Sequence, residues 1–166
     1  MAGSTPLLLN FISTTWNALG VPVRRYVTWL VHPKFIHGVA GVIFDEKGRV
    51  LLLRHRFWKG QRWGLPGGLA QHGETLAATL RRELREETGL DARALKLLRV
   101  TTSREWLAEF ILLAEASGVP EPRSAEIMAA QFWELARLPE NLLQSHRELL
   151  RELAAQPDLP GLPLEP

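Results

Sequence analysis

The sequence predicts an α/β domain in which strands surround one central helix and a second helix closes the chain. Two short apolar runs, 38–44 and 49–53, flank a turn at Gly48 and predict a β-hairpin. Residues 74–88 and 139–155 carry apolar side chains at helical spacing, so each predicts a helix with one buried face. Strands combined with two such helices are typical of a compact α/β/α arrangement.

The remaining elements of the domain follow from local composition. Residues 58–68 are rich in tryptophan, glycine and proline, which predicts a loop. Gly89 stands where the cap of the central helix is expected, because glycine readily adopts the left-handed conformation that ends helices. Two apolar stretches, 95–102 and 106–114, predict strands, and residues 127–135 are a third candidate.

Composition divides the chain into three parts. Residues 1–35 are predicted to form an amphipathic helical extension, because apolar side chains recur there at spacings of three and four. These side chains are Leu8, Phe11, Ile12, Trp16 and Leu19. The α/β domain is expected over residues 36–157. Residues 158–166 are expected to form an irregular, proline-rich tail.

Two roles are open for residues 1–30. They can pack on the domain or on a second subunit of a homodimer, or they can lie on a membrane surface with their aromatic side chains in the lipid. Sparse positive charge favours packing. No run approaches the roughly 20 apolar residues of a spanning helix. Residues 7–12 make a poor signal peptide, because no basic residue precedes them.

Charge and cysteine content exclude several classes of function. The net charge is only +2, so the chain gives no strong signal for nucleic-acid binding. The sequence has no cysteine, which excludes disulfides, thiolate metal sites and cysteine nucleophiles. A cysteine-free chain fits a reducing compartment, so we expect a cytoplasmic protein.

The predicted central helix carries an unusual group of carboxylates. Glu83, Glu86 and Glu87 fall within roughly 100° of one another around a helix, where like charges repel. Arg82 can relieve part of this repulsion, because it lies four residues before Glu86. Taken alone, the three glutamates indicate either a salt-bridged surface helix or a metal site.

Further fixed residues favour the metal site. The spacing matches, without a departure, the Nudix box G-x5-E-x7-R-E-U-x-E-E-x-G-U, in which U is a bulky aliphatic residue. The matching positions are Gly68, Glu74, Arg82, Glu83, Leu84, Glu86, Glu87, Gly89 and Leu90. A chance match has odds on the order of 10⁻¹⁰ at typical residue frequencies. Over residues 36 to 140 the chain therefore resembles the Nudix hydrolase family.

The resemblance implies a fold, a reaction and a metal. The fold would be the Nudix α/β/α sandwich with a mixed central sheet. The reaction would be hydrolysis of a diphosphate linkage in a small nucleotide-like substrate, either a nucleoside diphosphate derivative or a nucleoside triphosphate. The metal would be Mg²⁺, with Mn²⁺ as a substitute, because carboxylate oxygens suit these ions. The alternative is a non-catalytic Nudix-fold module that binds nucleotides, but such modules typically lose box glutamates.

Roles for individual residues also follow from the resemblance. Glu83 and Glu87 are expected to bind metal directly, Glu86 directly or through water, and Gly68 through its carbonyl oxygen. Glu86 is the first candidate for the general base and Glu126 the second.

The other box residues are expected to support this site. Arg82 would orient a box glutamate, and Glu74 would brace the preceding loop. Leu84, Gly89 and Leu90 would serve packing and helix termination.

Substrate contacts are expected just before the box and later in the chain. Arg54 and Arg56 alternate along a strand end, where a guanidinium can bind phosphate through two hydrogen bonds. Trp58, Trp63, Phe132 and Trp133 are aromatic candidates for stacking on a base, with Trp63 and Phe132 put first. Elements that mark Nudix enzymes for NADH, coenzyme A, ADP-ribose or dinucleoside polyphosphates are missing, so the resemblance does not identify the substrate.

Overall fold

The computed structural model describes residues 5–32, 34–104 and 106–156. The chain separates into two compact units, one up to Lys34 and one from Phe35 onward. Each unit is described here by itself. The predicted tail, 158–166, lies outside the described residues.

The first unit contains two helices, α1 (Thr5–Ala18) and α2 (Val21–Val31). The predicted helical extension is therefore confirmed. Gly20 has extended backbone angles between the helices, and Pro22 follows in the first turn of α2, where proline is tolerated. Across the described residues, no helix is long and apolar enough to cross a membrane.

The second unit is built on one mixed sheet, which contains seven strands among the described residues. The strands are β1 (Ile36–Phe44), β2 (Val50–His55), β3 (Trp63–Gly64), β4 (Gly67–Leu69), β5 (Arg93–Arg104), β6 (Leu107–Glu115) and β7 (Ile127–Trp133). The central order is β3-β2-β1-β6-β5, with β4 beside β1 and β7 beside β2. Strands β1 and β6 are parallel, and all other pairs are antiparallel.

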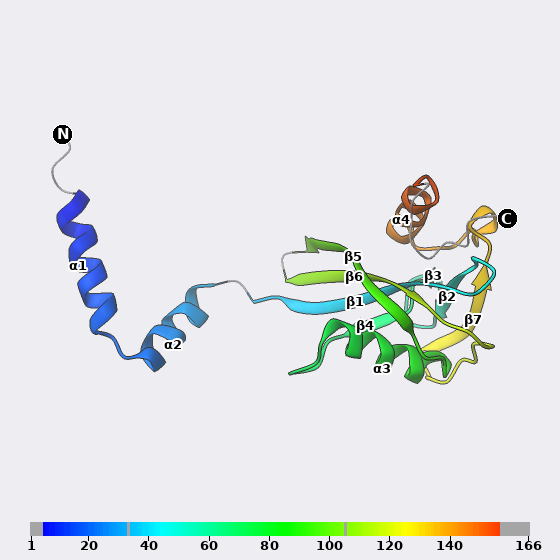
Figure 1. Ribbon diagram of the computed structural model, residues 1–166, viewed down its shortest axis with the longest axis horizontal. Coiled ribbons are helices and arrows are strands. Elements are labelled where there is room, and N and C mark those ends of the chain that lie inside the picture. The colour runs from blue at the N-terminus through cyan, green and yellow to red at the C-terminus, as the bar shows by residue number, and fades with distance from the viewer. Residues whose placement is uncertain (1–4, 33, 105, 157–166) are drawn as a thin grey trace. The chain divides into compact units, whose positions relative to one another are not determined.

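Two helices cover opposite faces of this sheet, α3 (Leu76–Thr88) and α4 (Gln144–Ala154), as Figure 1 shows. Each helix closes its own hydrophobic core, with Leu80 and Leu84 on one side and Leu149 and Leu150 on the other. The predicted α/β/α sandwich with a mixed sheet is confirmed. Glycine allows α3 to approach β1 closely, because a Cβ at Gly41 would lie 2.8 Å from the Leu80 side chain.

The predicted hairpin is present and is closed by one side chain. Phe44 pairs with Val50 across β1 and β2. Between them, the Asp45 carboxylate accepts hydrogen bonds from the backbone N–H groups of Lys47 and Arg49. It also accepts a 2.7 Å bond from the Arg49 guanidinium, so the turn is held by its own residues.

Two local expectations differ from the structure. Residues 58–68 are not all loop, because tertiary pairing with β2 and β1 makes β3 and β4 out of them. The closing helix begins at Gln144 rather than at residue 139. Before it, a short 3₁₀ helix spans Leu135–Arg137, and the Leu143 N–H donates to the Trp63 carbonyl, so this segment pairs with β3 instead of coiling.

Two buried histidines lie on the α4 side of the sheet. His55 stacks on Trp58, with ring centroids 3.8 Å apart, and His146 is buried nearby on α4. The His146 Nδ1 accepts a 3.0 Å hydrogen bond from the Leu65 N–H, so Nδ1 carries no proton and the imidazole is neutral. Burial, with a smaller contribution from the neighbouring His55, lowers the pKa of His146 to about 4.

This burial predicts a loss of stability in acid. The folded pKa of His146 is about 4 and the unfolded value is 6.5, so the unfolded chain takes up the proton first. The contribution of neutral His146 to the free energy of unfolding is complete above pH 6.5 and is lost as the pH falls toward 4. We expect His146→Asn, which keeps an acceptor near Nδ1, to reduce this loss by up to about 3 kcal/mol. Urea unfolding at both ends of this range measures it, and equal pH dependence in both proteins would contradict it.

Candidate active site

The site is organised by α3, whose ends are defined by its own sequence. The Thr75 hydroxyl accepts a hydrogen bond from the Ala78 N–H and caps the start of the helix. Gly89 ends the helix in the left-handed conformation, with φ 74°. Leu84 and Leu90 are buried in the core below the helix. The helix is thereby fixed with part of its carboxylate-bearing surface next to β4.

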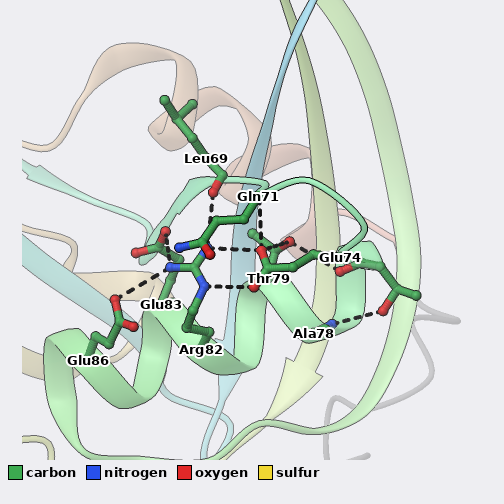
Figure 2. A network of polar contacts seen from close by, with 9 residues as sticks. Leu69, Gln71, Glu74, Ala78, Thr79, Arg82, Glu83 and Glu86 are labelled. Carbon is green, nitrogen blue, oxygen red and sulfur yellow. Dashed lines mark hydrogen bonds and ion pairs between the residues drawn. The ribbon is translucent and has the colours of Figure 1, made fainter.

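The Arg82 guanidinium connects most of the polar side chains in the site (Figure 2). It binds Glu74 at 2.8 and 3.1 Å and Glu83 at 2.8 Å. A longer contact of 3.4 Å reaches Glu86. The Nη2 that binds Glu74 at 3.1 Å also donates to the Leu69 carbonyl at 3.0 Å, so one side chain joins the helix to the end of β4.

Glu74 is a structural partner in this network. Its carboxylate accepts hydrogen bonds from the Gln71 N–H and the Thr79 hydroxyl as well as from Arg82. The bond from Arg82 is the main reason that the pKa of Glu74 falls to about 2. Glu74 therefore stays ionised and ties the loop before α3 to the helix.

Glu87 has a different environment, because it is almost completely buried. Only 8% of the residue is exposed, and its carboxylate accepts a 3.2 Å hydrogen bond from the Gly67 N–H. Burial, together with the charges of Glu83, Glu126 and Glu86, raises the pKa of Glu87 to about 8. The fold thus brings Glu126, in the turn just before β7, close enough for its charge to act on Glu87.

The two glycines of β4 leave the room that these carboxylates occupy. A Cβ at Gly68 would lie 2.2 Å from the carboxyl group of Glu83. At Gly67, where φ is 153°, a Cβ would lie 2.1 Å from the Val39 carbonyl oxygen. Gly67 is therefore required by backbone packing, whereas Gly68 is required by the position of the Glu83 side chain.

The residues present fit a divalent metal ion by their chemistry. The Glu83 carboxyl group lies beside Gly68, the Glu87 carboxylate accepts from the Gly67 N–H, and Glu86 follows on the same helix; such oxygens are the ligands that Mg²⁺ prefers. Repulsion among these carboxylates at buried Glu87 is the electrostatic condition that a cation relieves. Among the described residues, no three acidic or histidine side chains are grouped closely enough to hold one ion as they stand. Glu83 and Glu86 instead share the Arg82 guanidinium.

A cavity of about 740 Å³ borders the same glycines. It lies between the sheet and α4, and its lining includes Gly67 and Gly68 at one part and Trp58 and His146 at another. Glu109, on β6, also lines it, and no described side chain forms a hydrogen bond or ion pair with this carboxylate. A cavity of this size accommodates a nucleotide-sized molecule.

The expected aromatic contacts to the substrate need revision, whereas phosphate binding by Arg54 and Arg56 stays a prediction. Trp63 and Phe132 are only 9% and 8% exposed and belong to the two cores, so their rings are not free to stack on a base. Arg54 binds Gln61, and Arg56 donates to the Ala125 carbonyl.

The structure offers other cavity-lining residues in their place. Trp58 and His146 line the cavity, and so does Glu109. The indole of Trp58 has a local sequence signal, as an aromatic residue before the box. Glu109 and His146 lie on β6 and α4, far from the box in the sequence, and no local sequence pattern marks them.

Comparison with known proteins identifies relatives of this chain. The NUDIX domain family matches residues 34–153. The sequence is 35% identical over 132 residues to the 8-oxo-dGDP phosphatase NUDT18 of Danio rerio, covering 76% of this chain and 38% of that protein. It is 28% identical to the ADP-ribose pyrophosphatase of Methanocaldococcus jannaschii, covering 78% of each. A solved MutT NUDIX hydrolase from Burkholderia pseudomallei superposes with a TM-score of 0.63 at 26% identity, covering 72% of this chain and 98% of that one.

The two glycines give a matched test of the site's construction. We expect Gly67→Ala to destabilise the protein by several kcal/mol, because its Cβ collides with backbone that cannot move. Gly68→Ala should cost much less, because the flexible Glu83 side chain can turn away. Thermal unfolding of both variants measures the difference. Equal losses would show that Glu83 is as rigid as the backbone.

Proposed function

This chain belongs to the Nudix family, and from that premise we propose that it is a hydrolase of diphosphate linkages. The substrate would be a nucleoside triphosphate or a nucleoside diphosphate derivative, and the reaction would require Mg²⁺ or Mn²⁺. One observation carries the proposal. The buried carboxylate of Glu87 lies among other carboxylates, beside a glycine strand that borders a nucleotide-sized cavity.

The metal would be held by carboxylates and one backbone oxygen. Glu83 and Glu87 would bind it directly, Glu86 directly or through water, and Gly68 through its carbonyl. When bound, the ion supplies positive charge against the diphosphate oxygens and makes a nearby water more acidic. Arg82 would keep Glu83 in position, since it already links this carboxylate to Glu74.

Two residues compete for the role of general base. Glu86 is our first candidate, because its side chain is 58% exposed and has only a long contact to Arg82. An exposed carboxylate can take the proton of an attacking water and release it to solvent. Glu126 is the second candidate, because it approaches the same cluster from the turn just before β7.

The cavity gives the nucleoside part of the substrate a place beside the site. Trp58 has one face covered by His55, with the rings inclined by 8°, and the indole lines the cavity. An indole held in this way suits stacking on a base. We propose Trp58 for this contact in place of Trp63 and Phe132.

The relatives suggest which substrates to test first. The Danio rerio relative is named for an oxidised guanine nucleoside diphosphate and the Methanocaldococcus jannaschii relative for ADP-ribose. This chain spans only 38% of the length of the former, so its substrate and whole activity are proposals. A hydrolysis screen over nucleoside di- and triphosphates, their oxidised forms, and ADP-ribose would separate them. We propose the cytoplasm as the compartment.

Glu87→Gln tests the metal site. We expect turnover to fall by roughly 100-fold or more, because changing even a partner of a metal ligand costs about 10- to 100-fold. Stability should not fall, because Gln resembles the protonated form that burial favours at neutral pH. Glu46→Gln, in the exposed hairpin turn, is the control and should retain activity. Near-normal turnover of Glu87→Gln, or full activity of the wild type in a chelator, would refute the metal mechanism.

Glu86→Gln and Glu126→Gln distinguish the two candidate bases. We expect Glu86→Gln to lower kcat by about 10²- to 10⁴-fold and to remove the acid limb of the kcat-against-pH profile. Glu126→Gln should keep that limb. The reverse pattern, with the limb lost only in Glu126→Gln, would transfer the role to Glu126.

A further inference from the structure

The helical extension exposes an unusual amount of apolar surface. Of the side chains described in α1 and α2, none is buried, and Phe11 and Val31 are each 70% exposed. The other large exposed apolar residues are Leu8, Leu9, Ile12, Trp16, Val21, Val23, Tyr26, Trp29 and Leu30. Contiguous apolar patches of this kind mark surfaces that bind a partner or a membrane.

The apolar surface is wide on both helices. In α1 the opposite side carries Asn10, Ser13 and Asn17, which follow one another at spacings of three and four. In α2 the polar residues Arg24 and Thr28, four residues apart, share their strip with Val21 and Val31. Wide apolar faces with narrow polar strips are typical of helices that lie in the plane of a membrane interface.

The charges of this segment have one sign. Residues 1–44 contain three cationic side chains, Arg24, Arg25 and Lys34, and no acidic residue before Asp45. All three therefore suit an anionic surface, whereas the same segment of a second copy would present like charges. Lys34 also lies over the ring of Trp29, 4.4 Å from its centroid. Aromatic rings beside basic side chains are common at the level of lipid headgroups.

The positive charge is sparse, but it is all of one sign and lies beside exposed apolar side chains, so in place of the expected packing we propose that α1 and α2 bind the surface of a bilayer that contains anionic lipid. Their apolar faces enter the boundary between headgroups and acyl chains, and their cations contact the headgroups. The helices lie on the membrane and do not cross it, in accord with their length and composition. This inference does not rest on the proposed hydrolase activity.

Sedimentation of the full chain with lipid vesicles tests the proposal. The vesicles are phosphatidylcholine alone or an equimolar mixture with phosphatidylglycerol. We expect the wild-type chain to sediment with the mixture, and less with phosphatidylcholine alone or at high salt. Failure to sediment with either vesicle at low salt would overturn the proposal.

Matched variants separate insertion of the apolar face from attraction by charge. Ile12→Asp with Leu30→Asp places two anions on the apolar faces and should weaken binding by about tenfold or more. Asn10→Asp with Thr28→Asp adds the same charge on the polar sides and should weaken it much less. Equal losses in the two variants would overturn the inserted arrangement. Circular dichroism checks that both remain folded.

Light scattering without lipid distinguishes a protein partner. If the apolar faces pair two copies of the chain, the wild type is a dimer that Ile12→Asp with Leu30→Asp dissociates. That result without vesicle binding would replace the membrane by a second subunit and overturn the proposal.

Discussion

The ion pairs of Arg82 are the interaction on which the proposed site depends. Glu74, Glu83 and Glu86 all use the same guanidinium, and the Leu69 carbonyl joins it to β4. Without this cation, neighbouring carboxylates on one helix would repel one another and turn toward solvent. The arginine therefore holds the acidic side chains of α3 together and fixes the helix against the glycine strand.

The burial of Glu87 connects the structure of the site with its proposed function. A carboxylate that is 8% exposed and surrounded by other carboxylates opposes folding when it is ionised. At neutral pH it can hold a proton, or it can release the proton to solvent and bind a cation instead. The second choice converts an electrostatic cost of the fold into affinity for metal, which is the arrangement that diphosphate hydrolysis needs.

The sequence predicts the part of the site that is contiguous in the chain. Glu83, Glu86 and Glu87 share one helix, so their spacing alone places them together. The cavity cannot be predicted in this way, because residues such as Glu109 and His146 come from separate elements that meet only in the fold. Local patterns also cannot tell an aromatic residue that lines a cavity from one in the core, and Trp63 is in the core.

We propose that α3 and β4 together form a metal site. Its most direct test is a crystal structure of the protein with Mn²⁺, recorded at a wavelength where manganese scatters anomalously. The account predicts an anomalous peak bound by Glu83 and Glu87 beside the Gly68 carbonyl. A protein saturated with Mn²⁺ that shows no peak there, or only one elsewhere, would contradict it.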